Sequence, residues 1–188
     1  MKILVACEES QVVCKAFREK GHEAYSCDFQ CCSGGHPEWH IQDDVLPLLN
    51  GFCSFRTQNM IETDEPIWLL QKWDLIIAHP PCTYFSNAIM VNLGRNDRPD
   101  VFNDEWKAKF FENRKNAFDF VMKIWDADCD RICIENVVGY LSTHFQKPSQ
   151  YIEPYYFGDP WKKKTCLWLK SLPKLESTKV VTPTGKWV

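Results

Sequence analysis

The chain alternates short apolar runs with polar stretches, a pattern typical of buried strands joined by helices and loops. Residues 2–7 form the first apolar run and predict a buried strand. Apolar residues at helical spacing follow over 12–17, with Ser10 as the expected N-cap and Gly21 as the stop. Residues 22–28 predict a second short strand. A strand, a helix and a strand joined by short turns indicate a parallel α/β unit.

The pattern continues through the second half of the chain. Two almost wholly apolar runs at 74–78 and 131–134 predict strands that are buried on both faces. An apolar stripe over 104–126 predicts the longest helix, and 151–157 and 165–169 predict two late strands. No repeat or linker interrupts the pattern, so we expect the 188 residues to form a single domain. The expected fold class is α/β, with a doubly wound, mostly parallel, Rossmann-like sheet.

Composition and charge narrow the function classes. With 45% hydrophobic and 25% charged residues, the chain has the composition of a globular protein. A net charge of −3 argues against a protein that coats nucleic acid, although lysines crowd residues 162–186. Those lysines suit either a solvated face or phosphate contacts, and the sequence leaves both open.

The ten cysteines bear on the expected compartment. The N-terminus does not resemble a signal peptide, and no apolar stretch is long enough to span a membrane. We therefore expect reduced cysteines, a cytoplasmic location and no membrane partner.

Side chains that suit zinc gather in one predicted loop. They are Cys27, Cys31, Cys32, His36 and His40. This cluster lacks the two separated C-x-x-C pairs of a typical zinc site. We therefore assign no metal ligand, and zinc at the cluster stays an alternative.

Each predicted strand ends on residues that can perform chemistry. Ligands of open α/β sheets bind at the carboxyl ends of the strands, so we expect these residues to converge. The strand ends carry, in chain order, Cys7-Glu8-Glu9, Asp28, His79-Pro80-Pro81-Cys82 and Glu135-Asn136.

Cys82 is the leading nucleophile candidate. Pro80 and Pro81 stiffen the chain before it and fix its position. A thiolate there can attack an electrophile, whereas most cysteines in such a chain are buried and inert. Glu135 is a candidate proton donor or a structural helix cap. Asp28 suits both hydroxyls of a ribose, or it caps a turn.

Two blocks of the sequence resemble the cytosine-C5 DNA methyltransferase family. Residues 74–86, DLIIAHPPCTYFS, are similar to its Pro-Pro-Cys block, and 132–141, ICIENVVGYL, to its Glu-Asn-Val block. The order and separation of the two blocks also fit, and the looser resemblance covers residues 1–169. It implies a class I methyltransferase fold that uses S-adenosylmethionine.

The resemblance implies roles for three catalytic residues. Cys82 would attack C6 of cytosine, and Glu135 would bind N3 and the exocyclic amine. Asn136 would position the loop that carries Cys82. C5 would then receive the methyl group, and a base in a duplex would first be flipped out of the helix.

We also expect a mobile loop and two sets of binding residues. The loop is the long segment 83–102, which we expect to close over the substrate and to contact phosphate through its arginines. The expected cofactor-binding residues are Ala6, Cys7, Glu8, Asp28, Asp44 and Pro80, and the expected substrate-binding residues are Pro81, Ser86, Arg95, Arg98, Lys163 and Thr165.

The chain departs from the family in three places. Its first loop, residues 6–11, has no glycine, and Lys163 and Thr165 stand where the family has arginines. A target-recognition region is missing. The resemblance thus implies DNA or a smaller cytosine nucleotide as the substrate and leaves the choice open, and a recognition subunit or a homodimer is the expected protein partner.

Two rival functions remain open. In an amino-methyltransferase, an acid or Asn and an aromatic residue flank the two prolines, where this chain has His79 and Cys82. The other rival is a catalytically weak or inactive protein that keeps the methyltransferase fold and binds nucleic acid or a protein partner.

Overall fold

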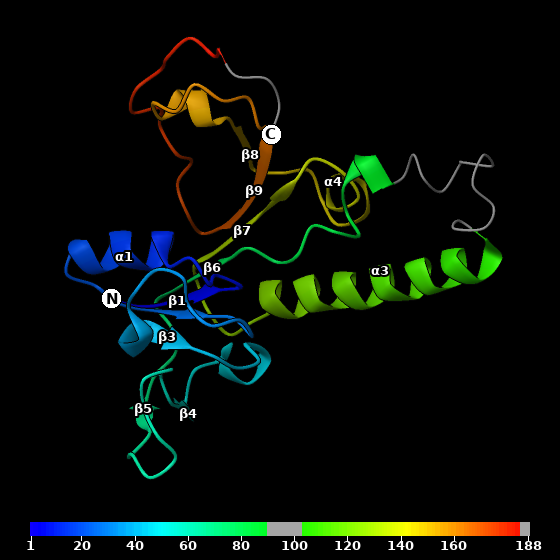
Figure 1. Cartoon of the computed structure of the whole chain (residues 1–188). Helices are drawn as coiled ribbons and strands as arrows, with labels where there is room; N and C mark the ends of the chain where they lie inside the picture. Colours follow the sequence, from blue (N-terminus) through cyan, green and yellow to red (C-terminus); the bar gives the residue numbers. More distant parts are fainter. Residues whose placement is uncertain (90–102, 185–188) are drawn as a thin grey trace. The chain divides into compact units, whose positions relative to one another are not determined.

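The computed structural model describes residues 1–89 and 103–184 (Figure 1). One sheet has the strand order β3-β2-β1-β6-β7-β9-β8, and β4 and β5 form a separate two-stranded sheet. The strands are β1 (Lys2–Ala6), β2 (Glu23–Cys27), β3 (His40–Ile41), β4 (Cys53–Phe55), β5 (Ile67–Leu69), β6 (Leu75–Ala78), β7 (Ile132–Val137), β8 (Gln150–Ile152) and β9 (Thr165–Lys170). The helices are α1 (Val12–Glu19), α3 (Asp104–Trp125) and α4 (Leu141–His144), with 3-10 turns at Pro37–Trp39, Leu46–Leu48 and Pro154–Tyr156.

Parallel pairing dominates the large sheet. In β1, Leu4 pairs with Tyr25 of β2 on one side and with Ile76 of β6 on the other, both in parallel. The β2–β3 and β6–β7 pairs are parallel too, while β8 and β9 are antiparallel. The order β3-β2-β1-β6-β7 corresponds to 3-2-1-4-5 when only these five strands are counted in chain order, as in Rossmann-like folds. The expected α/β class with a mostly parallel sheet is confirmed.

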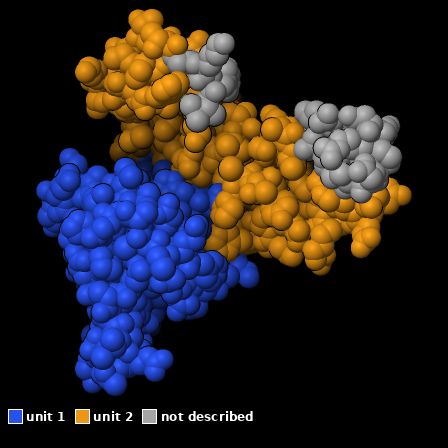
Figure 2. Space-filling model, viewed as in Figure 1, with its two compact units in different colours: residues 1–80, 123–134, 170–172 blue, residues 81–122, 135–169, 173–188 orange. Residues whose placement is uncertain are grey.

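The chain divides into two compact units, coloured separately in Figure 2. Unit 1 comprises Met1–Pro80, Lys123–Ile134 and Lys170–Leu172, and unit 2 comprises Pro81–Met122, Glu135–Leu169 and Pro173–Val188. The single domain expected from the sequence stays a prediction. In the part of the chain that is described, no helix combines the length and apolar character needed to cross a membrane.

Apolar strands and one face of α1 build the core of unit 1. Side chains of β1, including Ile3 and Val5, are fully buried beside Cys14 of α1 and Ala24 of β2. Each such burial of a large aliphatic side chain contributes about 1.5–3 kcal/mol. The core therefore holds the carboxyl ends of β1, β2 and β6 at one edge, where a ligand site is expected.

The start of α1 differs from the prediction. Its N-cap is Gln11, not Ser10, and Gln11 has a φ of 58° with no side-chain capping bond. Instead the Glu8 carboxylate accepts the backbone N–H groups of Val13 at 2.6 Å and Cys14 at 3.1 Å. A carboxylate satisfies these free donors more strongly than a hydroxyl does, because it also complements the helix dipole.

Other boundaries differ in ways that matter for the site. The predicted strand 131–134 continues as β7 through Val137, so Glu135 and Asn136 lie inside the strand rather than after it. The predicted strand at 151–157 is confined to β8, because Pro154 starts a 3-10 turn. The helix predicted over 104–126 is confirmed as α3.

Candidate active site

The Cys82 thiol lies in an exposed turn of unit 2. Both Pro81 and Cys82 are exposed, and the Cys82 carbonyl oxygen accepts the backbone N–H groups of Phe85 at 2.9 Å and Ser86 at 3.2 Å. These two bonds close residues 82–86 into a compact turn. Cys82 is a free cysteine whose side chain an incoming molecule can reach, as a nucleophile requires.

The Cys82 turn is joined to the segment that follows β7. Ser86 and Gly139 form an antiparallel bridge, and the Tyr140 N–H donates to the Phe85 carbonyl oxygen at 2.9 Å. A Cβ atom at Gly139 would overlap that carbonyl oxygen, so the approach requires glycine. The Phe85 and Tyr140 rings also stack, with centroids 6.2 Å apart. The two blocks that resemble the methyltransferase family therefore meet through main-chain bonds.

Arg114 of α3 holds the same turn from another side. Its Nε donates to the Tyr84 carbonyl oxygen at 3.0 Å, and its guanidinium lies over the rings of Phe110 at 4.4 Å and Tyr140 at 4.8 Å. The residue is only 5% exposed, and this burial lowers the pKa of Arg114. Sequence analysis missed Arg114, since one arginine in a charged helix gives no signal of burial.

Asn136 and Glu135 differ in exposure although they are neighbours in β7. Asn136 is buried, and its Oδ1 accepts the backbone N–H of Val137 at 3.0 Å. Glu135 is half-buried. Its charge helps to raise the pKa of the Cys166 thiol, which burial raises most, and the charge of Lys164 opposes this rise. Glu135 and Lys164 thus both lie within electrostatic range of the start of β9.

Lys163 and Thr165 are the expected substrate-binding residues next to β9, and Lys164 lies between them in the chain. Thr165 is buried in β9, and its hydroxyl donates to the Lys163 carbonyl oxygen at 3.1 Å. Lys163 and Lys164 are both exposed, and the Lys164 ammonium lies over the Tyr151 ring at 4.4 Å. Lys164 is therefore a lysine whose charge, like that of Glu135, acts on the Cys166 thiol, and no feature of the sequence favours it over Lys163. Arg95 and Arg98 lie outside the described residues.

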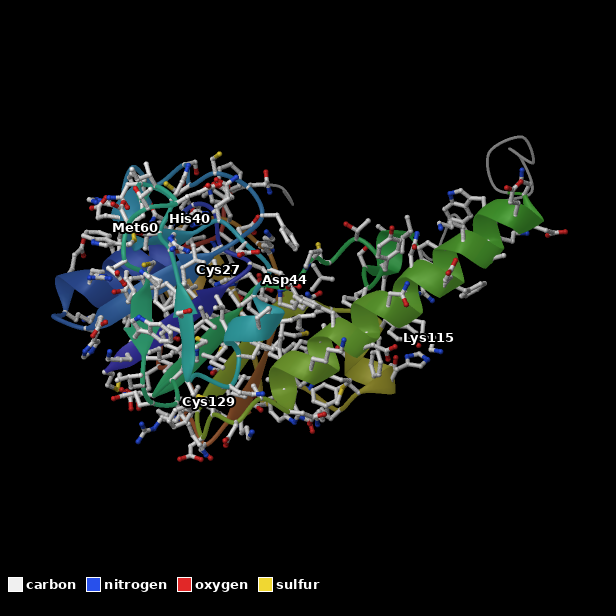
Figure 3. All side chains as sticks on the ribbon, turned by 90° about the horizontal axis from the view of Figure 1, so that it is seen from below. Cys27, His40, Asp44, Met60, Lys115 and Cys129 are labelled. Atoms are coloured by element: carbon white, nitrogen blue, oxygen red, sulfur yellow. The ribbon has the colours of Figure 1, made fainter. Side chains whose placement is uncertain are left out.

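In unit 1, three predicted cofactor residues come together at the strand ends. Burial, followed by the nearby carboxylates of Asp28 and Asp44, raises the pKa of the Cys7 thiol to about 12. The Cys7 N–H donates to the Cys27 carbonyl oxygen at 2.8 Å, which aligns the ends of β1 and β2. The charges of Asp28 and Asp44 (Asp44 is labelled in Figure 3) therefore both act on the Cys7 thiol within this unit.

The two aspartates also have local structural roles. The Oδ1 atom of Asp28 accepts the N–H of Gln30 at 2.9 Å, and Oδ1 of Asp44 accepts the N–H of Leu46 at 3.0 Å. Each carboxylate keeps a second oxygen that can accept hydrogen bonds from a ligand. Asp28 thus fixes its own turn, as the alternative interpretation of the sequence proposed, and still suits a ribose.

Glu8 and Ala6 show less capacity for a ligand. Glu8 is 5% exposed, and its two oxygens accept the helical N–H groups already described. Ala6 is fully buried, and its carbonyl oxygen accepts the N–H of His79 at 3.0 Å. Pro80 is buried at the end of unit 1.

Gln11 explains how the first loop folds without glycine. Cys7 and Gln11 both have a left-handed φ, 59° and 58°, in the region that glycine favours. Gln11 is fully buried, donates from Nε2 to the His36 carbonyl oxygen at 2.8 Å, and accepts the His36 N–H at 3.0 Å. The position that needs a glycine is Gly34, because its backbone lies so near Gln11 that an added Cβ would be 2.5 Å from the Gln11 Cβ.

Two members of the cysteine and histidine cluster, Cys27 and His40 (labelled in Figure 3), bond to groups outside it. His40 Nδ1 lies 2.9 Å from Ser26 Oγ, and its Nε2 lies 2.8 Å from the Gln30 carbonyl oxygen. Cys27 Sγ donates to the Asp43 carbonyl oxygen at 3.3 Å. Among residues 1–89 and 103–184, no three histidine, cysteine or acidic side chains are grouped to hold a metal ion.

The chain matches no protein-family model and no curated protein.

Proposed function

We propose that this protein is a methyltransferase that uses S-adenosylmethionine to methylate C5 of cytosine in DNA, through a covalent bond between Cys82 Sγ and C6. The observation that carries the proposal is the joining of the Cys82 turn to the segment after Glu135 and Asn136. The Tyr140–Phe85 bond and the Ser86–Gly139 bridge fasten these two parts of unit 2. A nucleophile and an acid that serve one pyrimidine need such a fixed relationship.

The side chains divide the work as follows. The Cys82 thiolate adds to C6, which moves an electron pair of the ring toward C5. Glu135 hydrogen-bonds N3 and the exocyclic amine and so stabilises the charge that develops there. Asn136 fixes the end of β7 through its bond to Val137. After C5 has received the methyl group, a base accepts the C5 proton, which returns an electron pair to the ring and releases Cys82 as a thiolate.

Unit 1 supplies residues that fit the cofactor. Asp28 follows β2, where a carboxylate can bind a ribose. Asp44 is close enough to Cys7 for its charge to raise the pKa of that thiol, as the charge of Asp28 also does. We assign the ribose to Asp28 and the adenine amine to Asp44. When bound, S-adenosylmethionine supplies the methyl group that C5 receives. The strand order of the parallel part supports a fold of the class I methyltransferase type.

A trapping experiment tests the chemistry. The protein is incubated with S-adenosylmethionine and an oligonucleotide that contains 5-fluorocytosine, whose C5 has no proton to lose. We expect a covalent adduct on Cys82 by mass spectrometry, and none with Cys82→Ser. Cys31→Ser is the matched control, because Cys31 is also an exposed free cysteine. An adduct that survives Cys82→Ser would assign the nucleophile to another residue.

Transfer of a labelled methyl group identifies the substrate. DNA, RNA and free dCMP are compared, and we expect incorporation into DNA, with transfer to dCMP alone pointing to a smaller nucleotide. No transfer to any of the three, together with no calorimetric binding of S-adenosylmethionine, would overturn the enzyme hypothesis.

A binding protein without turnover is the second candidate function. It is favoured by Glu8, whose carboxylate occupies the start of α1, where the family has a glycine-rich cofactor loop. This candidate predicts nucleic-acid or protein binding with no cofactor binding. The calorimetric measurement therefore separates the two functions.

A further inference from the structure

Lysines gather on the C-terminal part of unit 2. Residues 145–169 and 173–184 of this unit contain six lysines and three acidic residues, although the whole chain has a net charge of −3. The excess of positive charge is therefore local, and the rest of the chain is acidic by comparison. Positive charge that is concentrated in one part of an acidic protein attracts anionic ligands to that part.

The segment 161–164 is the densest part of this region. It reads Trp-Lys-Lys-Lys, and all four residues are exposed. Within residues 1–89 and 103–184, none of its three lysines forms an ion pair with a carboxylate. Other lysines do form such pairs, as Lys2 does with Glu23 at 3.5 Å. The three ammonium groups of the segment therefore carry charges that a bound anion can neutralise.

Hydrogen bonds hold both ends of the 161–164 segment. At its start, the Trp161 N–H donates to the Asp159 carbonyl oxygen at 2.8 Å. Near its end, the Lys163 carbonyl oxygen accepts the hydroxyl of Thr165, the first residue of β9. The lysines thus project from a segment that is fixed at both ends. Less conformational freedom is lost when such a segment binds a ligand than when a free tail does.

Two exposed aromatic rings accompany these lysines. Trp161 is 43% exposed, and Tyr151 of β8 is 38% exposed. Because β8 and β9 pair in an antiparallel manner (Figure 1), Tyr151 lies opposite Cys166, two residues after Lys164. The Lys164 ammonium lies over the Tyr151 ring at 4.4 Å. One ring therefore contacts a cation of the segment, and the other ring begins the segment.

The two rings indicate which anion fits this surface. A ligand that offers only phosphate groups would use the lysines and leave the rings in water. A lipid surface is also a poor match, because an interfacial segment needs a wide apolar face, and residues 162–164 are all charged. In a duplex the faces of the bases are covered by their neighbours. A single strand offers both phosphates for lysine and open base faces on which aromatic rings stack.

We infer that a Lys–aromatic surface, defined as Tyr151 and residues 161–164, binds a single strand of nucleic acid. The lysines contact phosphates, and the two rings stack on unpaired bases. The inference deepens the proposed function and rests on it for one point, that the bound strand is DNA that carries the target cytosine. Contacts of this kind do not depend on base identity, so they supply affinity without a target-recognition region.

Fluorescence anisotropy with a labelled oligo(dT) of about 20 nucleotides, longer than the site of one binding domain, tests the inference with the full chain. Oligo(dT) has phosphates and base faces but no cytosine, and S-adenosylmethionine is left out, so binding is measured apart from methyl transfer. We expect oligo(dT) to bind more tightly than a dA–dT duplex of the same length. Trp161→Ala should weaken the binding of oligo(dT) about 5-fold or more, the effect of losing one stacked base. Trp68→Ala is the matched control, because Trp68 of β5 is a tryptophan that is 61% exposed outside this surface.

The salt dependence of binding tests the lysines. Each phosphate contact of a single strand adds about 0.7 to the slope of log K against log salt concentration, so glutamine at all three positions 162–164 should reduce the slope by about 2. The control variant removes the same charge from α3, by glutamine at three exposed lysines, Lys109, Lys115 and Lys123. It should leave the slope unchanged, and circular dichroism should show native secondary structure for every variant.

Three results would overturn the inference. They are an unchanged affinity for oligo(dT) in the Trp161→Ala and 162–164 variants, binding of the duplex as tight as that of oligo(dT), and binding to phosphatidylserine vesicles with none to oligo(dT). The proposed function fails in a different way. Binding of oligo(dT) without any cofactor binding or methyl transfer would keep the Lys–aromatic surface and remove the enzyme. Methyl transfer to dCMP without binding of oligo(dT) would keep the chemistry and remove the surface.

Discussion

The backbone N–H of Tyr140 donates to the carbonyl oxygen of Phe85 at 2.9 Å. This bond connects the turn of Cys82 to the end of the strand that contains Glu135, two segments far apart in the sequence. Because it is a main-chain bond, it depends on how closely the backbones approach rather than on either side chain. The residues that permit this approach therefore control the position of the nucleophile.

Gly139→Ala should move the Cys82 turn. The added Cβ overlaps the Phe85 carbonyl oxygen, and a backbone atom cannot move aside as a side chain can. We expect a loss of about 1–3 kcal/mol in the free energy of unfolding, measured in urea, and slower formation of the Cys82 adduct.

Gly21→Ala is the control for that substitution. Gly21 has a φ of +79° and nothing within 4 Å of an added Cβ, so alanine there adds only conformational strain. It should cost about 1 kcal/mol and leave adduct formation unchanged. Equal rates of adduct formation for Gly139→Ala and Gly21→Ala would show that the turn does not position Cys82.

Arg114→Lys should weaken the same turn from the side of α3. Lysine keeps the charge but loses the planar group that lies over Phe110 and Tyr140 while bonding Tyr84. We expect about 1–3 kcal/mol lower stability in urea, because a buried charge loses its partners. The neighbouring Lys115→Met is the control, since Lys115 is exposed (Figure 3) and its loss should change stability by less than about 0.5 kcal/mol.

The sequence predicted the long central strands of the fold but not its short strands. The strands around 2–7, 74–78 and 131–134 were visible because each is an almost unbroken apolar run, and burial on both faces leaves few alternatives. β3, β4 and β5 were missed, since two or three residues are too few to show a period.

The candidate site was predictable only where one residue type implies one chemistry. Cys82 and Glu135 were proposed from their neighbours in the chain, whereas Arg114 and Gln11 act through contacts with residues 30 and 25 positions away. Ser10 was the wrong cap because local spacing cannot show that Glu8 turns back onto the helix. Long-range contacts of this kind leave no mark in a local pattern.

Glu8→Gln should weaken α1 and, through it, the start of the first loop. Glutamine keeps one acceptor oxygen but loses the charge that two helical N–H groups bind. We expect about 0.5–2 kcal/mol lower stability, the range for the loss of a helix cap. The exposed Glu19→Gln at the other end of α1 is the control and should have a smaller effect. If Glu8 also binds the cofactor, calorimetry will show a loss of cofactor affinity beyond that of an equally destabilised variant.

Alkylation should distinguish the candidate nucleophile from the cysteine beside the predicted cofactor acids. Burial and the carboxylates of Asp28 and Asp44 raise the pKa of Cys7 to about 12, so at pH 8 its thiol stays protonated and unreactive. Cys82 is exposed and should be labelled by iodoacetamide well before Cys7, as peptide mass spectrometry will show.

The same shift fixes how stability depends on pH. The folded-state pKa of Cys7 lies above the ordinary value of 9.0 for a cysteine thiol, so between these two values the folded protein holds a proton that the unfolded chain releases. Its contribution to stability is complete below pH 9 and is lost as the pH rises toward about 12. Asp28→Asn removes one of the two charges that raise this pKa, so it should speed the labelling of Cys7 at pH 9 and leave that of Cys82 unchanged. Labelling of Cys7 at the rate of Cys82 in the wild type would show that the strand ends of unit 1 do not bury this thiol beside two acids.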